Sequence, residues 1–243
     1  MGSEPRTILV TADPEPVVIE PARTAVIVVD MQNDFGAEGG MFALAGIDIR
    51  PIQAVVEPTA RVLEAARRSG MKVAYLKMEF RPDLSDVGGP DAPNWVKHAP
   101  LRVGETVTAP DGASSRVLIR DTWNTEILAE LTPREGDVLV SKTRYSGFYG
   151  TDLDVILRSL GVRHLVFTGC TTSVCVESTV RDAMFRDYRC LVLSDCVAEP
   201  IGNDLPRTNH DASLLVLERL FGWISDSSAL LQALRPEPAS VRS

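Results

Sequence analysis

The chain has 243 residues, and its content of 44% hydrophobic and 24% charged residues is typical of one large globular domain with a substantial core. The net charge of −8, with scattered Lys and Arg, argues against nucleic-acid or anionic-membrane partners, which favour a concentrated basic face. No apolar run approaches the ~20 residues of a transmembrane helix, and the N-terminus lacks the basic and apolar regions of a signal peptide. We therefore expect a cytoplasmic protein without a membrane partner.

Residues 1–23 hold four prolines and several acidic side chains, which favours an extended arm laid over the surface rather than a helix. Regular structure begins with the unbroken apolar run of residues 25–29, which predicts a strand covered on both faces that ends in Asp30. We assign residues 24–235 to one domain and the polar, proline-containing residues 236–243 to a flexible tail.

Short apolar runs and amphipathic stretches alternate along the domain. The apolar runs predict strands at residues 25–29, 73–76, 138–140, 164–167, 190–193 and 223–224. Helical spacing of apolar residues predicts helices at residues 52–66, 152–159, 175–188, 207–220 and 227–234. Strands that alternate with helices predict right-handed βαβ units, and hence an α/β fold with a mainly parallel sheet covered on both faces.

Two segments lack such periodicity. Residues 31–40 are expected to form a loop, and residues 78–121 are interrupted by prolines and glycines. A stretch as long as the second is disordered, an ordinary surface decoration, or a functional excursion over the scaffold. Aromatic side chains favour the functional excursion over disorder, namely Phe80, Trp95, His98 and, just beyond the stretch, Trp123.

Cys175 is a candidate nucleophile. It lies where the apolar run 165–167 gives way, through small and hydroxylated residues, to a helical pattern that includes Val176 and Val180. Unpaired N–H groups at a helix start favour the thiolate of a nearby cysteine and stabilise an adjacent oxyanion. The alternative is that Cys175 is a small buried core residue, the usual place of a free cysteine.

Asp30 and Lys142 also lie at the ends of apolar strands. Because the carboxyl ends of strands in an open parallel sheet gather functional groups, we expect these two side chains to meet Cys175 in one crevice. There the lysine favours the thiolate, and the carboxylate accepts the thiol proton and returns it to a leaving amine. Taken singly, Asp30 has the alternative role of a loop cap, and Lys142 that of a solvated strand end.

The four cysteines lack the spacing of metal ligands. They show neither a CxxC pattern nor Cys/His ligand spacing, and they cluster at strand ends, where reduced core thiols are expected. These cysteines are Cys170, Cys175, Cys190 and Cys196. We predict no disulfide, no metal and no cofactor.

Three blocks of the sequence resemble the signature blocks of the isochorismatase-like cysteine hydrolases. They are Val28-Val29-Asp30-Met31-Gln32-Asn33-Asp34-Phe35, Lys142-Thr143-Arg144-Tyr145-Ser146-Gly147-Phe148 and Gly169-Cys170-Thr171-Thr172-Ser173-Val174-Cys175-Val176-Glu177. The similarity extends over roughly residues 20–235 in the same order, and the three blocks together are highly specific. The resemblance assigns the family's catalytic triad to Asp30, Lys142 and Cys175.

The resemblance also implies a fold and an oxyanion site. The family's fold is a three-layer αβα arrangement around a six-stranded, mainly parallel sheet. A cis peptide precedes its cysteine, here Cys170–Thr171, and the N–H groups of Thr171 and Cys175 would bind the oxyanion. The metal-dependent nicotinamidase branch uses an Asp-x-His motif, which none of the three histidines of this chain completes. We expect a homo-oligomer, either a dimer or a tetramer.

Within the family the chain is similar to the ureidoacrylate amidohydrolases, notably at residues 144–148 and 221–226, whereas residues 79–84 look more like biuret hydrolases. The resemblance implies a cysteine amidohydrolase that cleaves the C–N bond of a small ureido or carbamoyl substrate through a thioester-type intermediate. The alternatives are a biuret, N-carbamoylsarcosine or other small-amide hydrolase, and a non-catalytic ligand-binding member. Glu79 is expected to bind ureide N–H groups, and Arg81 a carboxylate. The full set of expected substrate contacts is Phe35, Glu79, Arg81, Asn94, Trp95, Trp123 and Tyr145.

Overall fold

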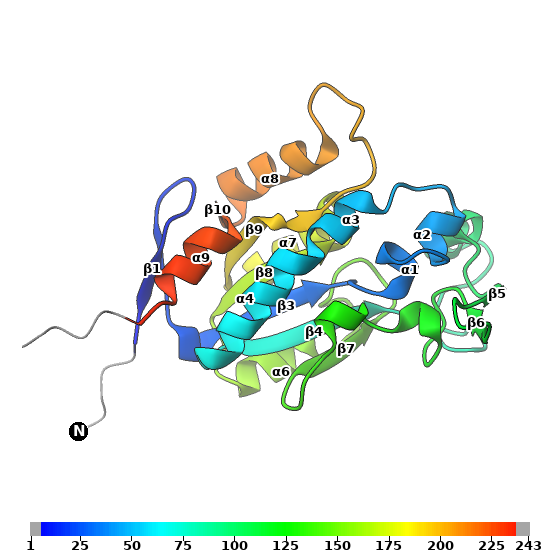
Figure 1. Cartoon of the computed structure of the whole chain (residues 1–243), viewed down its shortest axis with the longest axis horizontal. Coiled ribbons are helices and arrows are strands. Elements are labelled where there is room, and N and C mark those ends of the chain that lie inside the picture. The colour runs from blue at the N-terminus through cyan, green and yellow to red at the C-terminus, as the bar shows by residue number, and fades with distance from the viewer. Residues whose placement is uncertain (1–5, 237–243) are drawn as a thin grey trace, which may run out of the picture.

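A computed structural model describes residues 6–236 of the chain (Figure 1). The strands are β1 (Ile8–Val10), β2 (Val17–Ile19), β3 (Thr24–Val29), β4 (Lys72–Met78), β5 (Thr106–Thr108), β6 (Ser114–Arg116), β7 (Val138–Lys142), β8 (His164–Cys170), β9 (Arg189–Ala198) and β10 (Trp223–Ser225). The α-helices are α1 (Asn33–Gly36), α2 (Met41–Leu44), α3 (Arg50–Ala54), α4 (Val56–Arg68), α5 (Pro93–His98), α6 (Leu153–Ser159), α7 (Glu177–Met184), α8 (Asn209–Leu220) and α9 (Ser227–Ala233). Short 3₁₀ turns are η1 (Pro21–Arg23), η2 (Ala99–Leu101), η3 (Trp123–Thr125) and η4 (Ala129–Leu131), and a π-helical turn, η5 (Thr172–Val176), precedes α7.

The described residues contain a central sheet of six parallel strands in the order β10-β9-β8-β3-β4-β7. One hydrophobic core includes side chains of α3, α4 and α9, and the other includes side chains of α6, α7 and α8. Helices therefore cover both faces of the sheet (Figure 1). The predicted three-layer α/β fold is confirmed.

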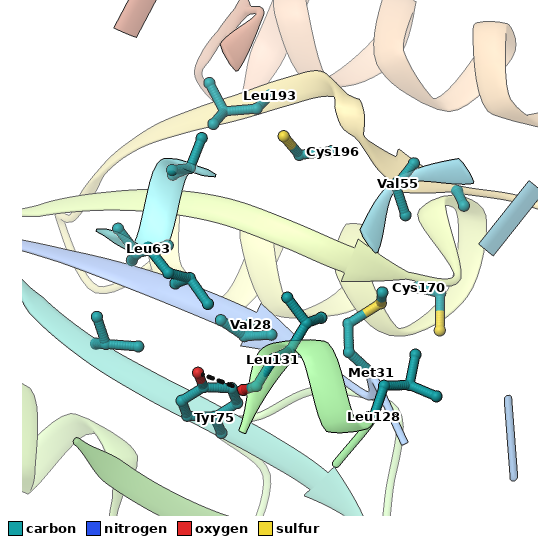
Figure 2. Close-up of a cluster of buried hydrophobic side chains, with 14 of the residues drawn as sticks. Val28, Met31, Val55, Leu63, Tyr75, Leu128, Leu131, Cys170, Leu193 and Cys196 are labelled. Atoms are coloured by element: carbon teal, nitrogen blue, oxygen red, sulfur yellow. Dashed lines mark hydrogen bonds between the residues drawn. The ribbon is translucent and has the colours of Figure 1, made fainter. Parts of the chain in front are cut away.

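Strand β3 lies inside the sheet, and its side chains alternate between the two cores. Val26 and Val28 face the first core, whereas Ile27 and Val29 face the second, and all four are fully buried. This double coverage explains the unbroken apolar run in the sequence. Figure 2 shows the first core, where the buried Tyr75 hydroxyl donates to the carbonyl of Leu131 at 2.8 Å.

The helix predicted at residues 52–66 is two helices, α3 and α4. Pro58 lies in the first turn of α4, and a proline ring clashes with the carbonyl of the residue four positions earlier, here Ala54. Helix α3 ends at that residue. The segment expected to be a loop, residues 31–40, contains the short helix α1.

We expected an extended arm over the surface at residues 1–23, but the described part of this segment packs into the domain. Strands β1 and β2 form an antiparallel hairpin, and inward side chains such as Val10 and Ile19 are buried in the first core. The expected tail, 236–243, falls almost entirely outside the described residues. Within residues 6–236, no helix has both the length and the apolarity to cross a membrane.

The long excursion at residues 78–121 is ordered and includes α5 and the β5–β6 hairpin. Asp34 ties it to the sheet. Its carboxylate accepts the backbone N–H of Leu118 at 2.7 Å, the backbone N–H of Met41 at 2.9 Å and the side-chain amide of Asn124 at 2.5 Å. Burial raises the pKa of Asp34 to about 6, and the three N–H donors oppose that shift. These bonds hold the excursion over the carboxyl end of β3.

A close approach of two backbones positions the loop after β8. Gly169 has φ of 110°, and a Cβ atom there would lie 2.0 Å from the Val29 carbonyl oxygen. Only glycine therefore allows β8 to pack against the end of β3 at this point. One residue further along the chain, the peptide bond between Cys170 and Thr171 is cis, as the family resemblance implied.

Candidate active site

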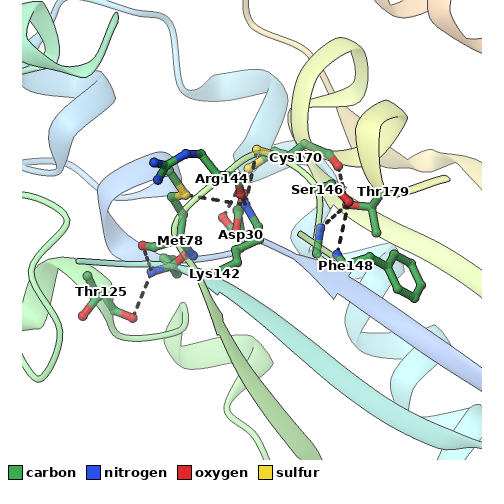
Figure 3. Close-up of polar contacts among 12 residues, drawn as sticks. Asp30, Met78, Thr125, Lys142, Arg144, Ser146, Phe148, Cys170 and Thr179 are labelled. Atoms are coloured by element: carbon green, nitrogen blue, oxygen red, sulfur yellow. Dashed lines mark hydrogen bonds and ion pairs between the residues drawn. The ribbon is translucent and has the colours of Figure 1, made fainter. Parts of the chain in front are cut away.

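Three side chains meet at the carboxyl edge of the sheet. Lys142 Nζ donates to Asp30 Oδ2 at 2.7 Å and lies 3.5 Å from Cys175 Sγ. Figure 3 shows the carboxylate and the ammonium side by side, with Met78 and Arg144 around them. All three side chains are buried, and Cys175 is only 6% exposed. The structure thus brings together the acid, the lysine and the thiol that the sequence places at separate strand ends.

The order of the strands explains this meeting. Strands β3 and β7 lie on either side of β4, so Asp30 and Lys142 approach each other across the end of β4. The register pairs Lys142 with Met78, whose sulfur lies 3.7 Å from Lys142 Nζ. Cys175 belongs to η5, which follows β8, the other neighbour of β3. Each group therefore comes from the end of a different strand or from the turn that follows it.

Asp30 and Lys142 form a buried ion pair. Burial raises the pKa of the Asp30 carboxyl, and the Lys142 cation opposes that rise. For Lys142, burial alone would lower the pKa, but the charge of the Asp30 carboxylate and its hydrogen bond to Nζ raise the pKa above its usual value. The second carboxylate oxygen, Asp30 Oδ1, is buried and has no hydrogen-bond partner within residues 6–236. Asp30 therefore has a free acceptor site for a proton.

The thiol of Cys175 is not the pre-formed thiolate expected at a helix start. Burial raises its pKa well above the ordinary value, the Asp30 anion raises it further, and the Lys142 cation opposes both. Burial is the largest of these effects. The resting site holds a neutral thiol beside a carboxylate, and the thiol proton must leave when the sulfur attacks.

A cavity of about 150 Å³ opens beside Cys175. Its polar lining residues are His98, Tyr145, Thr171 and Cys175. Its apolar lining residues are Phe35, Met41, Phe42, Ile47, Met78, Leu101, Leu118, Val174 and Ile201. A small, mostly apolar space with a few convergent polar groups suits a small organic substrate rather than a polymer.

Three other residues that we expected to contact the substrate or the oxyanion line this cavity together with Cys175. They are Phe35, Tyr145 and Thr171. Phe35 is buried and packs edge-on against Phe42, with ring centroids 5.0 Å apart. Tyr145 is 39% exposed and lies at the rim. These three residues stand where a bound substrate would touch them.

Glu79 and Arg81 do not reach the cavity, contrary to the expectation that they bind the ureide and the carboxylate. Glu79 is 4% exposed, and its carboxylate lies 2.9 Å from Lys77 Nζ and accepts the hydroxyl of Ser141. Arg81 has a side chain that is 62% exposed, and its backbone N–H donates to Asp86. Neighbouring residues of an extended chain point to opposite sides, so Met78 faces the cavity and Glu79 faces away.

Asn94, Trp95 and Trp123 also lie outside the cavity lining. Asn94 belongs to a neighbouring hollow of about 370 Å³ that shares Tyr145 with the cavity. Trp95 is partly buried against the first core. Trp123 lies in η3, where its backbone carbonyl accepts the side-chain amide of Asn33 at 2.8 Å. None of the three lines the cavity beside Cys175, although Asn94 lines the hollow next to it.

His98 is a cavity residue that the sequence analysis did not assign to the site. It ends α5, is 4% exposed and stacks near Tyr145, with ring centroids 5.7 Å apart. The only signal in the sequence is its position in the aromatic excursion, because no motif includes it.

Glu199 links the nucleophile loop to a second wall of the cavity. Its carboxylate accepts the Ser173 backbone N–H at 2.8 Å and the Ile201 backbone N–H at 3.0 Å. Ser173 lies two residues before Cys175, and Ile201 lines the cavity. Glu199 therefore fixes both segments relative to each other.

Comparison with known proteins agrees with this geometry. Residues 24–229 match the isochorismatase domain family. Ureidoacrylate amidohydrolase RutB of Caulobacter segnis is 41% identical over 224 residues, which cover 92% of this chain and 91% of that protein. Ureidoacrylate amidohydrolase RutB of Methylorubrum extorquens is 40% identical over 232 residues, which cover 96% of this chain and 91% of that protein.

The chain belongs to the isochorismatase family. Within that family it is an amidohydrolase, a hydrolase of carbon–nitrogen bonds other than peptide bonds. The resemblance seen in the three sequence blocks is thereby confirmed.

Solved structures of the family share the fold. A cysteine hydrolase from Pseudomonas syringae pv. phaseolicola aligns with a TM-score of 0.73 and 31% identity, covering 89% of this chain and 94% of that one. An N-carbamoylsarcosine amidase from Thermoplasma acidophilum aligns with a TM-score of 0.62 and 28% identity, covering 84% of this chain and 96% of that one. Both solved structures therefore share the fold of this chain.

We expect this amidohydrolase to keep its activity after exhaustive chelation. In the part of the chain that the structure describes, no group of three or more His, Cys, Asp or Glu side chains is arranged to hold a metal ion. The measurement is ammonia release before and after dialysis against EDTA. Loss of activity that a single added metal restores would contradict the expectation.

The raised pKa of Cys175 predicts how the free enzyme reacts with alkylating agents. Because only the thiolate reacts, the rate of inactivation by iodoacetamide should rise about tenfold per pH unit and should not level off near the ordinary thiol pKa of ~8.5. Mass spectrometry of the Cys175 peptide measures the rate. Cys190 is a matched internal control, since burial raises its pKa to about 12 and it lies away from the cavity. A plateau below pH 8 would show that the thiol is activated at rest.

Proposed function

We propose that Asp30, Lys142 and Cys175 form a catalytic triad that hydrolyses the ureido C–N bond of a small ureido acid such as ureidoacrylate. The observation that carries the proposal is the geometry of the triad: Lys142 Nζ lies 2.7 Å from Asp30 Oδ2 and 3.5 Å from Cys175 Sγ, directly beside a small cavity. The ureidoacrylate substrate is that of relatives about 40% identical over most of the chain.

In the first half of the proposed reaction, the sulfur of Cys175 bonds to the carbonyl carbon of the ureido group. Asp30 takes the thiol proton, which its raised pKa favours, while Lys142 keeps its charge and stabilises the developing negative charge. The C–N bond then breaks, Asp30 returns the proton to the leaving nitrogen, and an amine departs. Cys175 is left as an S-carbamoyl thioester.

In the second half, water attacks the thioester carbon. Asp30 accepts one proton of that water, the hydroxyl group bonds to the carbon, and the proton returns to the sulfur as the C–S bond breaks. The product is a carbamate, which decomposes to ammonia and carbon dioxide. We assign the backbone N–H groups of Thr171 and Cys175 to the oxyanion in both halves, where each donor contributes roughly 3–4 kcal/mol in favourable cases.

The carboxylate of a ureido acid must reach beyond the cavity. Within residues 6–236, no Lys or Arg lines the cavity itself. Arg144 and Lys97 line the neighbouring hollow on the other side of Tyr145, and neither forms an ion pair with a described carboxylate. We therefore assign the carboxylate tail to that hollow, in place of the Arg81 contact expected from the sequence.

The apolar lining favours a second candidate function, hydrolysis of a small uncharged amide or of a carbamoyl compound such as biuret. Nine of the lining residues are apolar, and a charged tail gains nothing from them. One solved relative of the same fold is named an N-carbamoylsarcosine amidase, and that compound, unlike biuret, carries a carboxylate.

Ammonia release from four substrates at matched concentrations separates the two candidates: ureidoacrylate, 3-ureidopropionate, N-carbamoylsarcosine and biuret. We expect the highest kcat/KM for ureidoacrylate. The control is the Cys175→Ala protein, which should release no ammonia from any of them. A preference for biuret, which has no carboxylate, would replace the first candidate with the second.

Tyr145→Ala tests the contact at the rim. Tyr145 lies between the cavity and the hollow, so its loss should weaken binding of the whole substrate without disturbing the triad. We expect KM for ureidoacrylate to rise about tenfold or more while kcat changes less. Tyr149→Ala is a matched control, because that exposed tyrosine is not part of either lining. An equal fall in kcat and kcat/KM would place Tyr145 in the chemical step instead.

Two further expectations from the sequence stay predictions. The homo-oligomer, a dimer or a tetramer, is checked by light scattering of the purified protein. The cytoplasmic location is checked by fractionation of cells that produce it.

A further inference from the structure

Of the two polar rings that line the cavity, those of His98 and Tyr145, the ring of His98 is the more deeply buried. It is 4% exposed and lies between two aromatic rings, with centroid distances of 5.8 Å to Phe80 and 5.7 Å to Tyr145. Its side chain lines the same cavity as Cys175. The ring orientation is therefore held by packing on both sides.

One hydrogen bond determines which ring nitrogen carries the proton. His98 Nδ1 lies 2.7 Å from the backbone carbonyl oxygen of Asn94. A carbonyl oxygen only accepts hydrogen bonds, so Nδ1 is the N–H donor. Burial lowers the pKa of His98, the Asn94 bond opposes this, and the nearby cations Lys142 and Arg144 lower the pKa further. The ring is therefore neutral, and Nε2 carries a lone pair.

That lone pair is unused in the described structure. Within residues 6–236, His98 makes no hydrogen bond other than the one from Nδ1, yet Nε2 is not sealed off in the core as the unpartnered nitrogen of His164 is. The ring borders the cavity, and the other cavity walls near it are apolar apart from Tyr145. An acceptor that no protein donor reaches, on a ring that borders the cavity, is available to an N–H donor of a bound ligand.

We propose that Nε2 of His98 accepts a hydrogen bond from an N–H of the substrate's carbamoyl group, and that His98 thereby selects carbamoyl and ureido compounds. This inference rests on the proposed function, since the carbonyl oxygen of that group faces the oxyanion donors and its N–H groups remain to be bound. His98 takes the role expected of Glu79, whose carboxylate is occupied by Lys77 and Ser141. A neutral acceptor recognises an N–H without demanding a charge on the substrate.

The test uses two substitutions, each of which places an amide group at the position of one of the two imidazole nitrogens. His98→Asn places an amide where Nδ1 lies and keeps a donor to the Asn94 carbonyl, but it has no acceptor at the Nε2 position. His98→Gln places its amide at the Nε2 position and supplies an acceptor there. Both are made in the Cys175→Ala protein, where binding is measured without turnover by titration calorimetry. The probes are 3-ureidopropionate and N-propylurea, which share the carbamoyl head and differ in the carboxylate.

We expect His98→Asn to weaken binding of both probes by about tenfold, and His98→Gln to recover most of that loss. Loss of affinity for 3-ureidopropionate alone would place His98 at the tail and overturn the inference. Equal effects of Asn and Gln, with both variants folded by circular dichroism, would reduce His98 to a packing residue and also overturn it. If neither probe binds to the Cys175→Ala protein that has His98 intact, the proposed function fails first.

A second measurement reports directly on Nε2. In protein with ¹⁵N-labelled histidine, the free enzyme should show the Nδ1–H tautomer of His98, and Nε2 should move upfield when 3-ureidopropionate binds, because its lone pair then accepts a hydrogen bond. An unchanged Nε2 resonance at saturating probe would contradict the inference even if affinity depended on the residue.

Discussion

Cys175→Ala is expected to lower kcat by roughly four to six orders of magnitude, because removal of the nucleophile leaves no covalent route and only binding and oxyanion contacts remain. The fold should persist, since the side chain is small and most of the packing around it is unchanged. Ammonia release under single-turnover conditions measures the loss, and thermal unfolding measures the stability.

Cys190→Ala is the matched control for that experiment. Cys190 is also a free, buried thiol in the second core, but it lies on β9 and does not line the cavity. Its replacement should leave kcat within about twofold of the unmodified enzyme. Ordinary activity in folded Cys175→Ala protein would rule out the covalent mechanism, whatever the control shows.

Breaking the Asp30–Lys142 pair is expected to have a second large effect, on both activity and stability. Lys142→Met keeps the length of the side chain but leaves Asp30 buried without its cation. Removal of one partner of a buried pair typically lowers the free energy of unfolding by roughly 3–5 kcal/mol. Activity should be lost as well, because no cation remains beside the sulfur.

The double variant Asp30→Asn with Lys142→Met separates the two roles. It removes both charges, so most of the lost stability should return while activity stays absent. Asp48→Asn is a control for ion pairs in general, because Asp48 pairs with Arg50 at the exposed surface and such a pair contributes roughly 0–1 kcal/mol. A double variant as unstable as Lys142→Met alone would show that the destabilisation does not arise from an unpaired charge.

The sheet and the three reactive groups were predictable from the sequence because local patterns specify them. A strand covered on both faces must be apolar throughout, as residues 25–29 are, and parallel strands separated by helices place their carboxyl ends at one edge. Asp30 directly follows β3, Lys142 is the last residue of β7, and Cys175 lies in the turn η5 that follows β8. How close the three groups come depends on the strand order, which only the structure shows.

The substrate contacts depend on side-chain direction, which a strand reverses at every residue. Met78 and Glu79 are adjacent in the sequence, yet the first lines the cavity and the second bonds to Ser141 on the other side. A shift of one residue in the prediction of where β4 ends therefore exchanges a cavity residue for a structural one.

The sequence by itself determined the α/β fold, the family and the Asp, Lys and Cys that form the candidate site, because these follow from periodicity, strand ends and contiguous motifs. The tertiary structure alone decided the identity of the cavity wall and the protonation of the thiol. His98 lines the same cavity as Cys175 because the excursion at residues 78–121, which Asp34 binds through the Leu118 N–H, folds back over the sheet. The packed core removes water from around Cys175, and this desolvation raises the pKa of its thiol, which favours the neutral form.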